Sequence, residues 1–278
     1  MIHTVVAHRF VGLVSGLAIA LLLAGCVVPP TAPPPPEPQP GVSKDRVTAS
    51  DETDAHKRAR VRLELAAAYF GRGQMGTALD QVKLALLAEP TMGEAFNMRG
   101  LIYASLGDHR LAEESFRKAI DLNARDTDAM HNFGWYLCQQ KRYPEANQQY
   151  AKVLELVPLR EGARTLLAQG VCQAFASNLP AAERSLARAY EIDPGNPAIA
   201  VNLSEVLYRL GEYERARTPI RRVNNMTDVV SPQTLWLAAR IEKRLGDEAA
   251  LNSIGRQLHS RFPDAKETAA FDGGRFSD

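Results

Sequence analysis

Residues 59–90 read ARVRLELAAAYFGRGQMGTALDQVKLALLAEP, and the pattern of this stretch returns every 34 residues, with one two-residue insertion near Arg160–Gly162. Its fixed positions include Ala66, Tyr69, Ala78 and the closing Pro90. Later copies hold, at the first three of these positions, Gly100, Tyr103, Ala112; Gly134, Leu137, Ala146; Gly170, Gln173, Ala182; and Ser204, Leu207, Ala216. A degenerate sixth copy has Ala238 and Ile241 at the first two positions, with Leu237 before them and an Ala249-Ala250 pair further on. A period of this length is typical of an array of stacked repeats.

Each copy is expected to form two antiparallel helices. The small residues let the two helices approach closely, and the late proline ends the second one because it cannot continue a helix. Gly73, Gly107 and Gly211 lie between the two helices of their copies. The pattern resembles the tetratricopeptide repeat. The resemblance implies an all-α, right-handed α-solenoid of about six repeats over residues 58–263, followed by a C-terminal tail at 264–278.

One proline departs from this pattern. Pro219 falls inside the second helix of the fifth copy, where a missing N–H is expected to kink or shorten that helix.

The N-terminus carries an export signal. Residues 11–23 (VGLVSGLAIALLL) are apolar or small, too few for a comfortable membrane span, and Leu23-Ala24-Gly25-Cys26 follows. This ending resembles the lipobox of bacterial lipoproteins, which implies a signal peptide at 1–25, a covalent lipid on Cys26 and no other cofactor. The alternative is an uncleaved anchor with an incidental cysteine. Residues 26–57 then form a linker whose proline-rich part, 29–40, suits a semi-rigid spacer.

The lipoprotein reading sets the expected location. Val27 and Val28 stand where an inner-membrane retention signal usually places Asp, so the outer membrane is favoured, with the repeats in the periplasm. Arg9 is the only charged residue before Cys26, so the mature chain has 32 basic and 32 acidic residues. This balance argues against nucleic acid as a partner.

No catalytic motif is present in the sequence. It lacks the His-Glu-x-x-His, Gly-x-Ser-x-Gly and phosphate-binding glycine patterns, and no histidine pair has metal-ligand spacing. We therefore expect no enzyme, no metal site and no small-molecule substrate. The densest basic stretch, Arg217–Arg222, is interpreted as a solvated helix face rather than an anion site.

A solenoid instead offers the concave surface formed by the first helix of each repeat. The inward positions predict a peptide-binding groove lined by Leu63, Phe70, Asn97, Leu101, His131, Trp135, Val171, Phe175 and Tyr208. Trp135 and Phe70 are the expected anchors, although Trp135 could instead pack against the neighbouring repeat. Asp128 occupies the position where chaperone-binding repeats need a cation, which disfavours a clamp for a C-terminal carboxylate.

Cys138 and Cys172 lie near the ends of neighbouring first helices. An oxidising compartment would let them form a disulfide, which would join the third and fourth repeats. The alternative is two buried free thiols.

A narrower resemblance comes from the third repeat. The run His131-Asn132-Phe133-Gly134-Trp135-Tyr136-Leu137-Cys138, the second Cys172, the stretch 202–208 (NLSEVLY) and the end around 261–276 are similar to the PilW/PilF family of type IV pilus biogenesis lipoproteins. Membership implies a pilotin-like scaffold whose partner is the pilus secretin or another pilus assembly protein. The alternatives are a periplasmic repeat lipoprotein that serves cell-wall enzymes, or one from a tight-adherence secretion system.

Overall fold

A computed structural model of the chain describes residues 53–276. The predicted signal peptide, Cys26 and the proline-rich stretch lie outside these residues. The described part is helical and contains no strand. Its elements are α1 (Asp54–Gly71), α2 (Met75–Ala88), α3 (Gly93–Leu106), α4 (His109–Leu122), α5 (Thr127–Gln139), α6 (Tyr143–Leu156), the short η1 (Leu159–Glu161), α7 (Ala163–Phe175), α8 (Leu179–Ile192), α9 (Pro197–Arg209), α10 (Tyr213–Asn224), α11 (Pro232–Leu245), α12 (Glu248–Arg261) and α13 (Lys266–Asp272).

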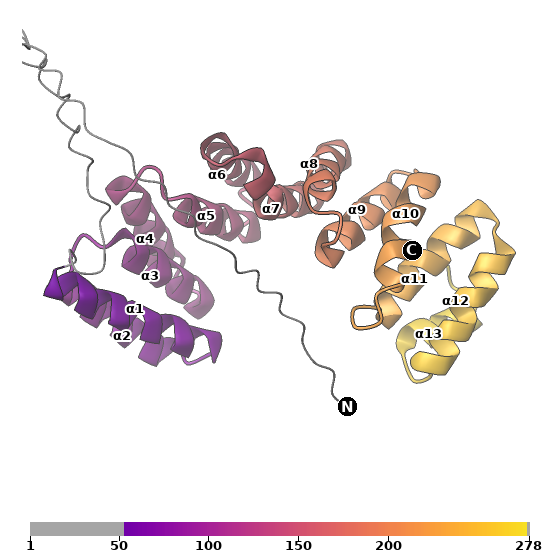
Figure 1. Ribbon diagram of the computed structural model, residues 1–278, viewed down its shortest axis with the longest axis horizontal. Helices are drawn as coiled ribbons and strands as arrows, with labels where there is room; N and C mark the ends of the chain where they lie inside the picture. Colours follow the sequence, from indigo (N-terminus) through magenta and orange to yellow (C-terminus); the bar gives the residue numbers. More distant parts are fainter. Residues whose placement is uncertain (1–52, 277–278) are drawn as a thin grey trace, which may run out of the picture. The chain divides into compact units, whose positions relative to one another are not determined.

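The helices pair in chain order, α1 with α2 through α11 with α12, as Figure 1 shows. The contacts inside each pair explain the small residues of the repeat. A Cβ added to Gly134 would lie 2.9 Å from the ring of Tyr150, and one added to Gly170 would lie 2.5 Å from Leu186. Since real Cβ atoms do not approach that closely, the large residue of one helix fills the space that the glycine of its partner leaves open. The predicted all-α solenoid is confirmed.

The turn inside each pair needs one residue with left-handed backbone. Gly107 and Gly211 supply it with φ of +78° and +81°. In the third and fourth repeats Lys141 and Ser177 adopt this conformation instead, with φ of +61° and +58°. Such a conformation is uncommon for residues with a Cβ, so these two turns are held by the packing of their helices.

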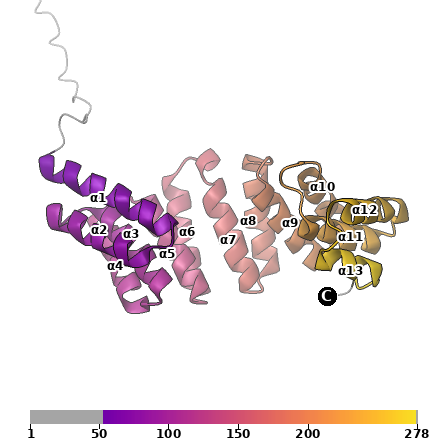
Figure 2. The same ribbon diagram turned by 90° about the horizontal axis from the view of Figure 1, so that it is seen from below.

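The first helices of successive repeats form a continuous row. α1 contacts α3, α3 contacts α5, and the series continues through α7 and α9 to α11. Figure 2 shows the helices following one another side by side in chain order. Because each repeat buries its apolar face only against its neighbours, the core is a string of clusters rather than one centre.

Pro219 lies inside the second helix of the fifth repeat, as expected. α10 passes through Pro219 and has 12 residues, two fewer than the 14 of α8.

The segment after residue 263 packs against the last repeat. α13 places Phe271 against α12, where a Cβ on Gly255 would lie 2.6 Å from its ring. The ring of Phe276 stacks on Trp236 of α11 at a centroid distance of 5.2 Å. This segment therefore covers apolar surface at the end of the repeats. None of the helices described is long and apolar enough to cross a membrane.

Candidate functional site: a groove along the first three repeats

Two adjoining hollows lie against the first helices of the first three repeats. One has a volume of about 420 Å³ and the other about 480 Å³. Both are lined by residues of α1, α3 and α5, and they share Leu101 and Asn132. Together they form one groove along the row of first helices.

The end of the groove near the C-termini of these helices is aromatic. Phe70 of α1, Leu101 of α3 and Trp135 of α5 line it together. Trp135 is half-buried, so part of its indole stays accessible from the hollow. Three apolar side chains from three different repeats thus converge on one space, which suits an apolar side chain of a partner.

The other end is more polar, and most of the charged residues that line it are acidic. Its lining includes Glu94, Asp126 and Asp128, with Arg125 as the cation among the lining residues. Asp126 caps the N-terminus of α5, since its Oδ1 accepts a hydrogen bond of 2.9 Å from the N–H of Ala129. Burial raises the pKa of the Asp126 carboxyl, and the nearby carboxylates of Glu94 and Asp128 raise it further, against the effect of the capping bond.

Amides lie on the groove between these ends. The Nδ2 of Asn132 on α5 donates a hydrogen bond of 3.2 Å to the Oδ1 of Asn97 on α3. Both side chains are half-buried and line the polar hollow. Their remaining amide donors and acceptors suit the backbone of an extended peptide.

The structure brings five of the nine predicted groove residues together: Leu63, Phe70, Asn97, Leu101 and Trp135 line the two hollows. Val171 and Phe175 lie on α7, outside both hollows, and Phe175 is 60% exposed.

Two predicted groove residues lie in the interior instead. His131 is only 8% exposed, and its Nδ1 lies 3.0 Å from the Oγ1 of Thr165 in the next repeat. Burial lowers the pKa of His131 to about 4, and the guanidinium of Arg164 lowers it as well. Tyr208 is 4% exposed and lies under the guanidinium of Arg240, whose carbon is 4.6 Å from the ring centre. Residues of the following repeat cover both side chains. The pattern within one repeat does not predict these contacts between repeats.

Cys138 of α5 and Cys172 of α7 are joined by a disulfide, and their Cα atoms are 5.8 Å apart. Both residues are buried in the cluster that contains Phe116, Phe133 and Tyr150. The bond ties the third repeat to the fourth, next to the aromatic end of the groove.

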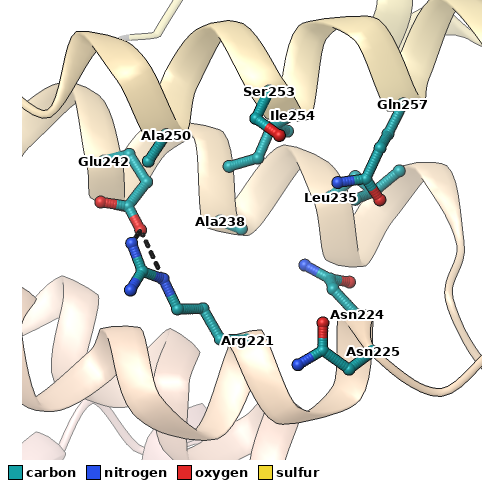
Figure 3. A pocket seen from close by; sticks show the side chains of 10 residues that line it. All are labelled: Arg221, Asn224, Asn225, Leu235, Ala238, Glu242, Ala250, Ser253, Ile254 and Gln257. Carbon is teal, nitrogen blue, oxygen red and sulfur yellow. Dashed lines mark hydrogen bonds and ion pairs between the residues drawn. The ribbon is translucent and has the colours of Figure 1, made fainter.

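A third hollow, of about 260 Å³, lies between α10, α11 and α12 (Figure 3). At one side Glu242, only 1% exposed, accepts a hydrogen bond of 3.1 Å from the Nε of Arg221. Arg217 donates to the same carboxylate through its Nε at 3.0 Å. Arg221 is exposed, as expected for a solvated face, but Arg221 and the more buried Arg217 also neutralise a buried acid on the next helix.

Residues 53–276 contain no group of three or more histidine, cysteine or acidic side chains that could hold a metal ion. The groove presents apolar surface, amides and carboxylates.

Sequence models of the tetratricopeptide repeat match residues 93–126, 127–156 and 176–226. The chain is thus a tetratricopeptide-repeat solenoid, a class of scaffold whose inner surface binds other proteins. It is homologous to PilF and PilW.

The similarities extend over most of the chain. The type IV pilus assembly protein PilF of Pseudomonas aeruginosa is 24% identical over 212 residues, which are 75% of this chain and 82% of that protein. A solved structure of Pseudomonas aeruginosa PilF superposes with a TM-score of 0.69 at 22% identity, covering 80% of this chain and all of that one. The crystal structure of PilW, described as a widely conserved type IV pilus biogenesis factor, gives a TM-score of 0.66 at 25% identity and covers 76% and 97%.

Sequence reasoning missed part of the groove. Asn132 and Gln139 line the hollows, as does Asp126, which precedes its helix. A helix-start signal was available at Asp126, since Asp directly before a helix is a strong N-cap. Asn132 was harder to predict, because its side chain lines the groove only as a result of how α5 packs beside α3.

Proposed function

We propose that this chain acts in type IV pilus biogenesis as a binding scaffold, and that its groove holds a segment of another pilus assembly protein. The homology to PilF and PilW supports the pathway. The groove supports the mode of action, because apolar side chains from three repeats and amides from two of them converge on a space that an extended segment fits. This convergence is the observation that carries the proposal.

We further propose that the protein works as an outer-membrane lipoprotein with a pilotin-like role. The lipid on Cys26 would hold the repeats at the membrane where the secretin assembles, and the groove would hold the secretin or a protein that accompanies it. The lipobox at 23–26 and the proline-rich spacer that follows support the anchoring. The repeats perform no reaction in this account.

Deleting the gene and restoring it with variants tests the proposal. Unboiled outer-membrane fractions are probed for secretin multimers, and intact cells for surface pili. We expect the deletion to lose both, and the wild-type gene to restore them. Cys26→Ala should mislocalise the protein and fail to restore the multimers. Trp135→Ala should leave the protein in place and also fail.

Leu87→Ala is the matched control, because Leu87 is an 80% exposed apolar side chain on α2 that lines neither hollow. It should restore both phenotypes. Unchanged multimers and pili in the deletion strain would exclude the pilus role and favour a scaffold in another envelope pathway, such as one for cell-wall enzymes.

A further inference from the structure

The acidic end of the groove holds charge that side chains of the protein do not neutralise. Asp128 is paired with Arg164, whose Nη1 lies 3.1 Å from its Oδ1. Glu94 is exposed and has no hydrogen-bond or ion-pair partner among residues 53–276. Asp126 accepts hydrogen bonds from backbone N–H groups at the start of α5, but no cationic side chain among residues 53–276 pairs with it.

The surroundings of these two carboxylates are negative on balance. Glu94, Asp126 and Asp128 line the hollow against the single lining cation Arg125. The mutual repulsion of the three acids contributes to the raised pKa of Asp126. A cation bound between Glu94 and Asp126 would relieve this repulsion, and the partly buried position of Asp126 would weaken the screening by solvent.

The distance between the two ends limits how a ligand can use both. Glu94 and Leu101 both lie on α3, seven positions apart. At about 1.5 Å per residue this is an axial separation of about 10 Å. An extended peptide covers the same distance in about three residues, at roughly 3.3 Å each.

Resting on the proposed function above, we propose that the groove selects a basic peptide segment. Its Lys or Arg would lie between Glu94 and Asp126, and an aromatic or branched apolar side chain about three residues away would enter the hollow formed by Phe70, Leu101 and Trp135. The peptide backbone would run over Asn97 and Asn132. The groove thus has a charge preference opposite to that of repeats that clamp a C-terminal carboxylate.

The test selects binders from a displayed library of random short peptides on the purified full-length chain. Selected peptides should be enriched in Lys or Arg about three positions from an aromatic or aliphatic residue. A synthetic peptide of the selected sequence is then titrated against variants at low and high salt. Glu94→Gln combined with Asp126→Asn should weaken binding about threefold to tenfold at low salt, and the loss should shrink as salt rises. Asn remains a good N-cap, so α5 keeps its start.

Glu114→Gln is the matched control, since Glu114 is an exposed acid on α4 that lines neither hollow. It should bind the peptide like the wild type. An apolar motif without basic enrichment, lost in Trp135→Ala, would overturn the charge preference but keep the groove as a peptide site. Failure to enrich any peptide, or binding insensitive to Trp135→Ala, would overturn both this inference and the groove's proposed role.

Discussion

His131 shows what burial does to a single side chain in this protein. Its imidazole lies between Thr165 of the following repeat and the ring of Tyr150, whose centre is 5.8 Å away. The folded protein therefore holds a neutral histidine whose pKa is lowered to about 4. The unfolded chain binds a proton near pH 6.5, so below that pH protons favour the unfolded state.

This difference predicts a pH-dependent stability. The contribution of His131 is complete above about pH 6.5 and is lost as the pH falls toward about 4, by about 1–3 kcal/mol. His131→Gln, which cannot take up a proton, should lose less stability over this range than the wild type. Urea unfolding at pH 7 and pH 4.5 measures the difference. Equal losses in both proteins would contradict the lowered pKa.

Residues of this kind mark the limit of the sequence-based predictions. The groove residues Phe70, Leu101 and Trp135 were found because an inward position on a first helix is fixed by the repeat period alone. His131 and Tyr208 occupy inward positions too, but the next repeat covers them. How closely two repeats approach depends on the packing of the side chains between them. The repeat period alone does not predict this packing. The left-handed turns at Lys141 and Ser177 were missed because the helices, not a glycine, impose them.

At the scale of helices, the Cys138–Cys172 disulfide joins α5 to α7 across a separation of 34 residues. Closing a loop of that size stabilises a fold by roughly 3–4 kcal/mol, chiefly by restricting the unfolded chain. Cys138→Ala combined with Cys172→Ala should therefore lower the free energy of unfolding by about that amount. A reducing agent should destabilise the wild type and leave the double variant unchanged. An unchanged wild type under reducing conditions would show that the bond adds nothing.

The contact between α10 and α11 depends on a buried acid. Glu242 is shielded from water, while Arg217 and Arg221 reach the surface with side-chain exposures of 21% and 49%. Removing both cations would leave the carboxylate buried without a partner, whereas removing the carboxylate leaves cations that water can solvate.

Unequal effects of substitution follow from this arrangement. Arg217→Met combined with Arg221→Met should cost about 2–4 kcal/mol in unfolding free energy, and Glu242→Gln should cost less. Arg215→Met is the control, since Arg215 pairs on the surface of the same helix with an exposure of 54%. Its cost should stay under about 1 kcal/mol. Equal costs for the double variant and Arg215→Met would refute a structural role for Glu242.

At the scale of the whole molecule, repetition of a short sequence pattern produces an extended surface formed by the first helices of the repeats. Each repeat contributes its first helix to this row, and the first three of these helices line the groove. The number and order of the repeats could be predicted from the 34-residue period. The position of the hollows along the row of first helices could not be predicted, because it depends on the volumes of side chains from adjacent repeats.

The central claim is that this groove, and not another surface, contacts a pilus assembly protein. The direct test places a photo-crosslinking amino acid in cells at Ser105, an exposed residue of the aromatic hollow, or at Leu87 on α2. We expect Ser105 to crosslink to a pilus assembly protein, Leu87 to give no such product, and Trp135→Ala to abolish the crosslink. A product from Leu87 with none from Ser105 would place the contact elsewhere and contradict the account.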